Sequence, residues 1–286
     1  MSEAIAPRTP HDPKVGLVLS AGAARGLAHI GVLQVLREQG MPVDLVVGSS
    51  MGAIVGALFC YGLDLHWLVG LASRLNWRFL VRFTHPREAL LRPSGLEELL
   101  RLLLRDGSFS QLRCPLAVVA TDLLTGRPVV LQQGPLVPAL MASAAIPGIF
   151  PPVRREGQVL VDGGVLQRLP VRLARQLGAE YVIAVDVGTT EHEAKVRGIL
   201  DTLLSTLDIM EREISRVEVE SADLLIRPEL GEIGGTRLDQ AEWLIEQGRR
   251  AAQEVIPSLK ARLARDAGQP VVAPDRRVDT GRGGSV

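Results

Sequence analysis

The chain has 286 residues, which is enough for one large α/β domain, or for two small ones, with a complete hydrophobic core. Apolar residues make up 47% of the chain but aromatic residues only 3%, so Leu, Val, Ala and Ile must form most of that core. The formal net charge is +0, which gives no support for binding to nucleic acid.

The two ends of the chain differ in composition from the part between them. Residues 1–13 contain three prolines and no apolar signal core, and we expect a disordered leader there. Residues 266–286 are rich in Gly, Pro, Asp and Arg, and we expect a disordered tail. A single folded domain is therefore predicted for residues 14–265.

The first part of that domain alternates between short apolar runs and helix-forming runs. Residues 14–20 predict a buried parallel strand, which runs into a Gly/Ala-rich loop over residues 21–26. A helix is expected over residues 27–39. A second strand over residues 45–48 and a second helix over residues 53–61 follow.

Residues 63–105 are Leu-rich and predicted to be helical. Arg74, Arg78 and Arg82 are spaced four apart, which puts them on one helical face. The neighbouring face carries Leu71, Leu75, Phe79 and Phe83. Adjacent basic and aromatic faces suit the surface of an anionic bilayer, so residues 74–83 are a candidate peripheral membrane contact. The alternative is a core helix with a solvated Arg edge.

The rest of the chain continues to alternate between strands and helices. Strands are expected at residues 115–121, 129–132, 159–161, 181–187 and 222–226, and helices at residues 136–145, 171–177, 198–217 and 239–263. The last helix is expected to be interrupted near Pro257, and the amphipathic helix over 198–217 to pack on the body of the protein rather than form a lid. This order predicts a mainly parallel sheet covered by helices on both faces.

No stretch offers about 18 uninterrupted apolar residues, the length that a membrane-spanning helix needs. Cys60 and Cys114 lack metal-ligand spacing and lie in apolar surroundings, which favours free thiols in a reducing compartment. We therefore expect a cytoplasmic protein without a metal site, and nothing in the sequence specifies an oligomeric state.

Gly48, Ser50 and Gly52 have the spacing of a nucleophile elbow, in which a strand turns sharply into a helix with a serine at the apex. Glycines suit such a turn because it leaves no room for side chains beside the serine. The N-terminal amides of the following helix point at the apex and favour negative charge developing there. Taken alone, the same five residues could be an ordinary turn.

A serine that attacks an ester needs a base to take its proton, donors for the oxyanion and a dry site. Histidine is the usual base, and the histidines of this chain are His11, His29, His66, His85 and His192. None follows the end of a predicted strand, and His29 is expected to pack or bond locally. A Ser-His-Asp triad is therefore poorly supported.

A carboxylate is the better candidate base. Asp162 follows a predicted strand, and the two glycines after it keep the backbone close and unobstructed. Since the carboxyl ends of parallel strands form the ligand crevice of such a sheet, Asp162 can meet Ser50 there and act as its general base. Asp122 and Asp186 also follow predicted strands and are alternative bases. The structural alternative is an aspartate that only caps a turn.

The Gly/Ala-rich loop over residues 21–26 joins a strand to a helix, so its amides converge on an anion and could hold the oxyanion. The loop also has some likeness to a dinucleotide-binding fingerprint. Only Gly22 and Gly26 match its glycines, however, and Asp44 precedes the next strand, whereas a ribose-binding acid should follow that strand. The sequence therefore disfavours an oxidoreductase.

Five segments, in this order, resemble motifs of the patatin-like phospholipase family, especially its small bacterial single-domain members. The segments are residues 20–33, 48–52, 120–123, 142–148 and 162–164. The resemblance covers roughly residues 14–257. It implies a three-layer α/β/α fold and no metal or cofactor.

The resemblance also implies a Ser–Asp dyad in which Ser50 is the nucleophile and Asp162 its base. The other site residues that it implies are Gly22, Ala23, Ala24, Arg25 and Gly26 in the oxyanion loop, Gly48 and Gly52 in the elbow, and Gly163 and Gly164 after the aspartate. Within the loop, the amides of Gly22 and Ala23 would be the donors and Arg25 would support the loop. The expected substrates are carboxylic esters of lipids, hydrolysed through an acyl-serine intermediate.

The chain departs from the family pattern in two places. The family usually has three consecutive glycines where this chain has Ala21, Gly22 and Ala23, and an alanine amide can still donate provided that its φ stays negative. The family also commonly has Asn in the segment after the aspartate, where this chain carries Arg168. That arginine could alter substrate choice or hold Asp162 ionised.

The function expected from the sequence is a cytoplasmic serine lipid acyl hydrolase, similar to a phospholipase or lysophospholipase, at or near the inner membrane surface. Two alternatives stay open. One is a non-catalytic adaptor that uses the same fold to bind a lipid or a protein. The other is an acyltransferase that passes the acyl group to an acceptor other than water.

Overall fold

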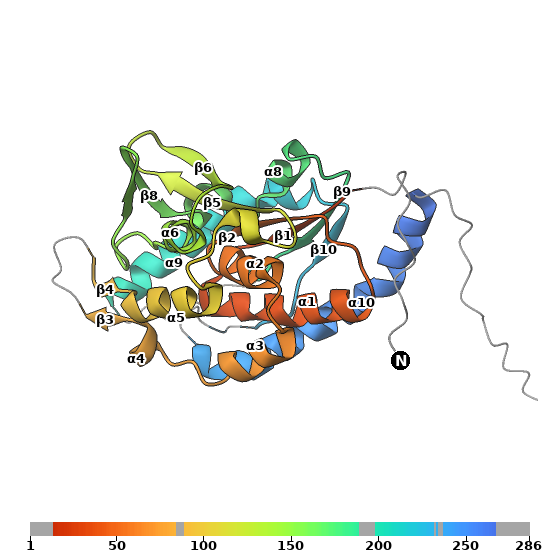
Figure 1. Ribbon diagram of the computed structural model, residues 1–286, viewed down its shortest axis with the longest axis horizontal. Coiled ribbons are helices and arrows are strands. Elements are labelled where there is room, and N and C mark those ends of the chain that lie inside the picture. Colours follow the sequence, from red (N-terminus) through yellow and green to blue (C-terminus); the bar gives the residue numbers. More distant parts are fainter. Residues whose placement is uncertain (1–13, 84–88, 189–197, 232, 234–236, 267–286) are drawn as a thin grey trace, which may run out of the picture.

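The computed structural model describes residues 14–83, 89–188, 198–231, 233 and 237–266 (Figure 1). The predicted leader over residues 1–13 lies outside these residues, as does the predicted tail apart from Asp266. His11, His85 and His192 also lie outside them.

A central 8-stranded sheet has the order β10-β9-β1-β2-β5-β8-β7, with β6 paired to β5. Its parallel strands are β1 (Val15–Leu19), β2 (Leu45–Ser49), β5 (Leu116–Asp122), β9 (Tyr181–Val185) and β10 (Leu224–Ile226). The strands β6 (Arg127–Leu131), β7 (Val153–Arg155) and β8 (Gln158–Asp162) pair antiparallel with their neighbours. The mainly parallel sheet predicted from the sequence is confirmed.

Helices cover both faces of this sheet. The longer ones are α1 (Ala28–Glu38), α2 (Met51–Tyr61), α3 (Leu65–Ala72), α5 (Ser94–Leu104), α6 (Leu136–Ser143), α9 (Ile199–Val219) and α10 (Ala241–Asp266). The shorter ones are α4 (Trp77–Leu80), α7 (Gly164–Gln167) and α8 (Val171–Gln176), with 3₁₀ turns at Ala23–Leu27, Phe109–Gln111 and Leu238–Gln240. Figure 1 shows α1 and α10 on one side of the sheet and α8 on the other.

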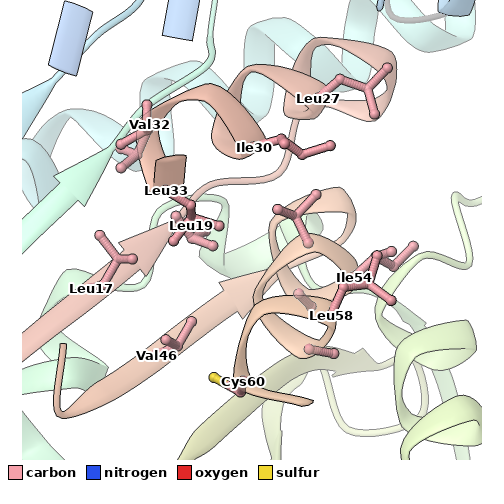
Figure 2. Packing of buried hydrophobic residues seen from close by; sticks show 14 of the residues in the cluster. Leu17, Leu19, Leu27, Ile30, Val32, Leu33, Val46, Ile54, Leu58 and Cys60 are labelled. Atoms are coloured by element: carbon pink, nitrogen blue, oxygen red, sulfur yellow. The ribbon is translucent and has the colours of Figure 1, made fainter. Parts of the chain in front are cut away.

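Side-chain alternation along the strands divides the core between the two faces. Leu17 and Leu19 of β1 belong to the larger cluster, which α1, α2 and α10 cover. Val18 belongs to a smaller cluster that includes residues of α8. Figure 2 shows Leu17, Leu19 and Val46 of the larger cluster on the side of the sheet that α1 and α2 cover. The three-layer α/β/α fold expected from the sequence is therefore confirmed.

The prediction of one continuous helical face over residues 74–83 is wrong. Asn76 is extended, and its side chain accepts a hydrogen bond from the Arg78 amide at 3.0 Å, which starts the short helix α4. Val81 is extended again, so the helix ends before Arg82. Arg82 and Phe83 form β3, which pairs with β4 (Leu91–Arg92).

The expected interruption near Pro257 is also absent, because α10 runs through that residue. Its neighbours Ile256 and Leu259 are buried in the larger core cluster. Packing of this apolar face holds the helix together despite the hydrogen bond that proline cannot donate.

Cys60 is buried, Cys114 is half-buried, and both are free thiols. Among the described residues, no helix has the length and apolar character that crossing a bilayer would require.

Candidate active site

Ser50 lies between β2 and α2 with φ 53° and ψ −123°. A non-glycine residue with positive φ is strained, and such strain clusters at functional sites. Gly48 and Gly52 allow the turn because the surrounding backbone is close: a Cβ on Gly48 would lie 2.5 Å from Ala53 Cα, and one on Gly52 would run into the Leu19 carbonyl. The sharp turn expected from the Gly-x-Ser-x-Gly spacing is therefore present.

The Ser50 hydroxyl donates a hydrogen bond to Asp162 Oδ2 at 2.6 Å. The other carboxylate oxygen, Oδ1, accepts one from the Gly164 amide at 2.7 Å. Ser50 is 5% exposed and Asp162 4% exposed, so the pair is nearly closed off from water. The structure thus brings together the two residues that the sequence singled out, 112 positions apart.

The two residues meet for a different reason from the one predicted. Along β5, β6 pairs with residues 118–122, β2 with residues 116–119 and β8 with residues 120–122. The residues of β5 that pair with β6 overlap those that pair with β2 and those that pair with β8. Because each edge of a strand can hold only one partner at a given residue, β2 and β8 must both lie along the edge of β5 opposite β6.

On this shared edge, β2 and β8 run toward each other. Ser49 at the end of β2 pairs with Val119, and Asp162 at the end of β8 pairs with Ala120. The expectation that Asp162 ends a parallel strand is wrong, because β8 is antiparallel to β5. Ser50 and Asp162 are neighbours because two strands end head to head.

A segment that the sequence analysis gave no role ties the two strand ends together. Ser143 Oγ accepts a hydrogen bond from the Ser50 amide at 2.9 Å and donates one to the Val119 carbonyl at 2.6 Å. The Ser143 carbonyl accepts from the Gly163 amide, and the Ala145 carbonyl from the Asp162 amide. The only signal in the sequence was that residues 142–148 form one of the motif segments.

Burial raises the pKa of Asp162 to about 6, while the hydrogen bonds from Ser50 and Gly164 oppose the rise. A carboxylate with such a pKa is ionised at neutral pH, yet it is more basic than an exposed aspartate. It is therefore suited to taking a proton from the hydroxyl that it contacts.

The predicted oxyanion loop lies beside this pair. A Cβ on Gly26 would lie 2.5 Å from Met51 Cγ, which places the loop against the residue after Ser50. The Ala21 amide donates to the Arg168 carbonyl at 2.9 Å and is therefore occupied. Within the described part of the chain, the amides of Gly22 and Ala23 have no such partner, and they can act as donors to an anion.

The condition placed on Ala23 is not met. Its φ is 47°, so the residue lies in the left-handed region rather than at the negative φ that the sequence analysis required. The Ala23 amide still has no backbone partner among the described residues, so the positive φ does not remove this donor. An alanine in this conformation is strained and must be held by its surroundings. Ala24 and Gly26 are buried behind it in the 3₁₀ turn.

The sequence profile of the family described as patatin-like phospholipase matches residues 17–175. This match spans more than half of the chain and includes Ser50, Asp162 and the loop at residues 22–26. The chain belongs to the patatin-like phospholipase family.

Several curated proteins are similar to this patatin-like chain. An uncharacterized NTE family protein of Mycobacterium tuberculosis is 40% identical over 190 residues, which cover 64% of this chain and 52% of that protein. A second one is 30% identical over 269 residues, covering 85% and 46%. A patatin-like phospholipase domain-containing protein of Caenorhabditis elegans is 35% identical over 187 residues, covering 62% and 14%. The chain spans about half the length of the mycobacterial relatives.

The fold has a counterpart among solved structures. The crystal structure of VipD from Legionella pneumophila superposes with a TM-score of 0.63 at 15% identity, over 87% of this chain and 67% of that one. At this identity the likeness concerns the fold alone.

The other residues considered as bases have partners other than Ser50. Asp122 accepts hydrogen bonds from the Thr125 hydroxyl and the Leu124 amide, so it caps a turn. Asp186 forms an ion pair with Arg227 at 2.8 Å. His29 is buried, with Nε2 2.9 Å from the Ser20 carbonyl, and burial lowers its pKa to about 4.

Two carboxyl groups that the sequence analysis did not single out reach the site from α9. Asp208 Oδ1 lies 2.6 Å from Arg25 Nη2 and 3.5 Å from Arg168 Nη1. A Cβ on Gly164 would lie 2.8 Å from Glu211 Oε1 and 3.1 Å from Asp162 Oδ1, so both carboxyl groups face the same point. Burial raises the pKa of Glu211 to about 7, and the Asp162 charge adds to the rise. Arg168 thus pairs with Asp208, and the pKa of Asp162 is raised rather than lowered.

A surface cavity of about 930 Å³ lies elsewhere, lined by residues that include Leu230, Arg237 and Trp243. Neither Ser50 nor Asp162 lines it. Among the residues that the structure describes, no cluster of three or more His, Cys, Asp or Glu side chains could hold a metal ion.

Proposed function

We propose that the protein is a serine hydrolase that acts on the carboxylic esters of lipids. Ser50 is the nucleophile and Asp162 its general base, and the reaction passes through an acyl-serine intermediate. The observation that carries this proposal is the 2.6 Å hydrogen bond from the Ser50 hydroxyl to Asp162 at a strained turn. Membership of the patatin-like phospholipase family supports a lipid ester as the substrate.

In the first half of the reaction, Asp162 takes the Ser50 proton while Oγ attacks the ester carbonyl carbon. The negative charge that develops on the carbonyl oxygen faces the amides of Gly22 and Ala23. When the tetrahedral intermediate collapses, the C–O bond of the ester breaks and the alcohol leaves with the proton from Asp162. The acyl group remains on Ser50.

In the second half, Asp162 takes a proton from water, which attacks the acyl-serine carbonyl. The proton returns to Ser50 Oγ as the carboxylic acid leaves. The burial of the pair supports this cycle, because the Ser50–Asp162 hydrogen bond is stronger in a low-dielectric site. No metal ion is needed at any of these steps.

The test compares wild type with Ser50→Ala and Asp162→Asn on p-nitrophenyl esters and phospholipids. Both substitutions should reduce hydrolysis to the background rate and leave the circular dichroism spectrum unchanged. Asp122→Asn is the matched control, because this aspartate also ends a strand but its carboxylate accepts from the 122–125 turn and the Val159 amide rather than from Ser50. Asparagine keeps an oxygen for these amides, and the variant should keep full activity. Full activity of Ser50→Ala would reject the nucleophile.

Two further measurements separate the alternatives. Labelling of wild type, but not Ser50→Ala, by a fluorophosphonate probe is expected for a hydrolase; an unlabelled wild type would favour the non-catalytic adaptor. Product analysis in the presence of a lysolipid acceptor distinguishes hydrolysis from acyl transfer. We expect free fatty acid as the main product.

We also propose that the segment over residues 74–83 contacts the inner surface of an anionic membrane. Phe79 and Phe83 are 77% and 93% exposed, although they lie on α4 and β3 rather than on one helix. Arg74, Arg78 and Arg82 are exposed close by along the chain. Exposed aromatic rings beside exposed cations are the composition that binds an anionic bilayer.

Sedimentation with vesicles of phosphatidylglycerol and phosphatidylcholine tests this contact. A variant carrying Arg74→Glu, Arg78→Glu and Arg82→Glu should lose binding, and Phe79→Ala with Phe83→Ala should weaken it. A control with the same change in net charge carries Arg154→Glu, Arg172→Glu and Arg250→Glu, three exposed residues on β7, α8 and α10. Equal binding by the two triple variants would reject the contact.

A further inference from the structure

Helix α9 lies beyond residues 17–175, which the family profile matches, yet it brings charged side chains to the site. Asp208 and Glu211 are three residues apart and therefore lie on the same side of the helix. Asp208 contacts Arg25 and Arg168, and Glu211 lies against Gly164. The question is what Asp208 does for a site that already has its nucleophile and base.

The two arginines that Asp208 contacts come from different parts of the site. Arg25 belongs to the oxyanion loop, between Ala23 and Gly26. Arg168 follows α7, the short helix that begins after the Asp162 turn. The Arg168 carbonyl also accepts the hydrogen bond of the Ala21 amide. The start of the loop is thus tied to Arg168 by its backbone, and its middle is tied to Arg168 through Asp208.

Both arginines are buried, so each depends on the Asp208 carboxylate to balance its charge. Arg168 is 1% exposed, and its Nε and Nη2 atoms have no hydrogen-bond partner within the described part of the chain. Arg25 is also buried. Glu211 also faces both arginines, but burial raises its pKa to about 7, so it is only partly charged at neutral pH. Asp208 is the carboxylate that contacts both guanidinium groups, and these groups repel each other more strongly once it loses its charge. Neutralising Asp208 would therefore push the Arg25 side chain, and with it the loop, away from its position.

The loop over residues 21–26 needs to be held in place by a contact such as the one between Arg25 and Asp208. Ala23 is held at φ 47°, a conformation that an alanine leaves readily when its surroundings allow it. In the proposed reaction, the amides of Gly22 and Ala23 can face the oxyanion only while the loop keeps this shape.

We propose that Asp208 is a positioning residue of the acyl-transfer site: it anchors Arg25 to Arg168 and so holds the oxyanion loop in the shape that presents the Gly22 and Ala23 amides. This inference rests on the proposed hydrolase function for its kinetic consequence. The structural consequence, an anchored loop, does not depend on that function.

The first experiment compares Asp208→Asn with Glu213→Gln, a control on the same helix whose exposed side chain forms an ion pair with Arg216. Asparagine keeps an oxygen that can accept from Arg25 but removes the charge. Hydrogen exchange of the amides at residues 22–27 should become at least about tenfold faster in Asp208→Asn and stay unchanged in the control. Unchanged exchange in Asp208→Asn would overturn the proposal, even in a protein without hydrolase activity.

The second experiment measures ester hydrolysis. Asp208→Asn should lower kcat at least about tenfold with little change in KM, because a small displacement of the oxyanion donors acts on the transition state. Asp208→Glu, which keeps the charge, should restore part of the loss. A general loss of stability would instead lower the amount of active enzyme, which titration with the fluorophosphonate probe corrects for.

A double-mutant cycle identifies the partner. If Asp208 acts through Arg25, the variant with both Asp208→Asn and Arg25→Gln should have a kcat no lower than that of Arg25→Gln alone. Multiplicative losses, or an Asp208→Asn enzyme with wild-type kcat, would refute the positioning role while leaving Ser50 and Asp162 untouched. An inactive wild type would refute the hydrolase proposal and leave the exchange result to decide on the anchor.

Discussion

The elbow and α9 supply polar groups to the same site in different ways. At the elbow, backbone groups fix the geometry: the Ser50 amide is held by Ser143, and the Gly164 amide holds Asp162. The polar groups that helix α9 brings to the site are charged side chains, those of Asp208 and Glu211. The elbow should therefore be sensitive to any added atom, whereas α9 should be sensitive to changes of charge.

The largest effect is expected at Gly52. A Cβ there would collide with the carbonyl of Leu19 at the end of β1, and backbone on both sides leaves no room to relax. Gly52→Ala should therefore cost more than about 3 kcal/mol of the free energy of unfolding, or prevent folding. The measurement is the urea midpoint.

Gly70→Ala is the matched control for this change. Gly70 lies in α3, and no atom of the described residues outside the backbone of this helix lies within 4 Å of the added carbon. Alanine should therefore stabilise the helix by about 0.5–1 kcal/mol. Equal destabilisation by the two variants would contradict the close packing at the elbow.

The ionised form of Asp162, which the proposed reaction needs, should lower the free energy of unfolding. Its pKa is raised, so between about pH 4 and pH 6 the folded protein binds a proton that the unfolded chain has lost. Stability therefore falls as the pH rises through this window. Asp162→Asn removes the loss and should unfold at a higher temperature than wild type at pH 8.

The size of this gain follows from the pKa. A shift of about two units corresponds to about 3 kcal/mol, and the advantage of Asp162→Asn should vanish below about pH 4. Asparagine can accept from the Gly164 amide and donate to Ser50, so both hydrogen bonds of the site are kept. Melting temperatures measured from pH 4 to pH 8 check this, and a pH-independent difference would argue against a raised pKa.

Ser143 should have a smaller effect. Ser143→Ala leaves the buried Ser50 amide without its acceptor and removes a donor from the Val119 carbonyl. Unpaired buried groups of this kind cost about 1–3 kcal/mol. Ester hydrolysis should fall as well, because the strained backbone of Ser50 loses its restraint.

Ser49→Ala is the control for Ser143. Ser49 is also a buried serine, but its Oγ has no hydrogen-bond partner among the residues that the structure describes. Its substitution should change stability by less than about 0.5 kcal/mol. A Ser49→Ala variant that is as unstable as Ser143→Ala would show that volume rather than hydrogen bonding decides at this edge of the sheet.

The sequence predicted the elbow well because a strained turn imposes local rules. Glycine is required at positions 48 and 52, and a serine must stand between them, so five residues carry the whole pattern. Buried parallel strands such as β1, β2 and β9 are uninterrupted apolar runs and were also predicted.

The pairing between strands that are distant in the sequence could not be predicted from such local patterns. The run over residues 159–161 predicts a strand but not its direction, and β8 is antiparallel to β5. The breaks around Asn76 depend on one side-chain cap, and the continuity of α10 through Pro257 depends on tertiary packing.

The charges of α9 had no local signature at all. Asp208 and Glu211 look like ordinary polar residues of an amphipathic helix, and only the packing of α9 against α7 brings them to the site. Ser143 was similarly visible only as part of a motif segment. Residues that act through contacts with distant parts of the sequence can be identified only from the structure.

The smallest effect is expected at Glu211 and concerns the pH dependence of the rate. It tests directly whether a charge on α9 acts on the site. The groups that face it are Asp162, Asp208, Arg168 and Arg25. With a pKa of about 6 for Asp162 and about 7 for Glu211, Asp162 loses its proton at the lower pH, and its charge then raises the pKa of Glu211. The rate should fall as the pH drops through about 6, because Asp162, the proposed base, becomes protonated, and a second inflection is expected near pH 7.

Glu211→Gln should remove the inflection near pH 7 and keep the one near pH 6, since glutamine has nearly the same shape and no charge to lose. The measurement is kcat/KM from pH 5 to pH 9, and Glu213→Gln on the exposed side of α9 is the control with an unchanged profile. A profile of Glu211→Gln that still shows both inflections would assign the upper one to another group. In that case α9 would influence the site through Asp208 alone, as an anchor of the loop rather than as a second titrating group.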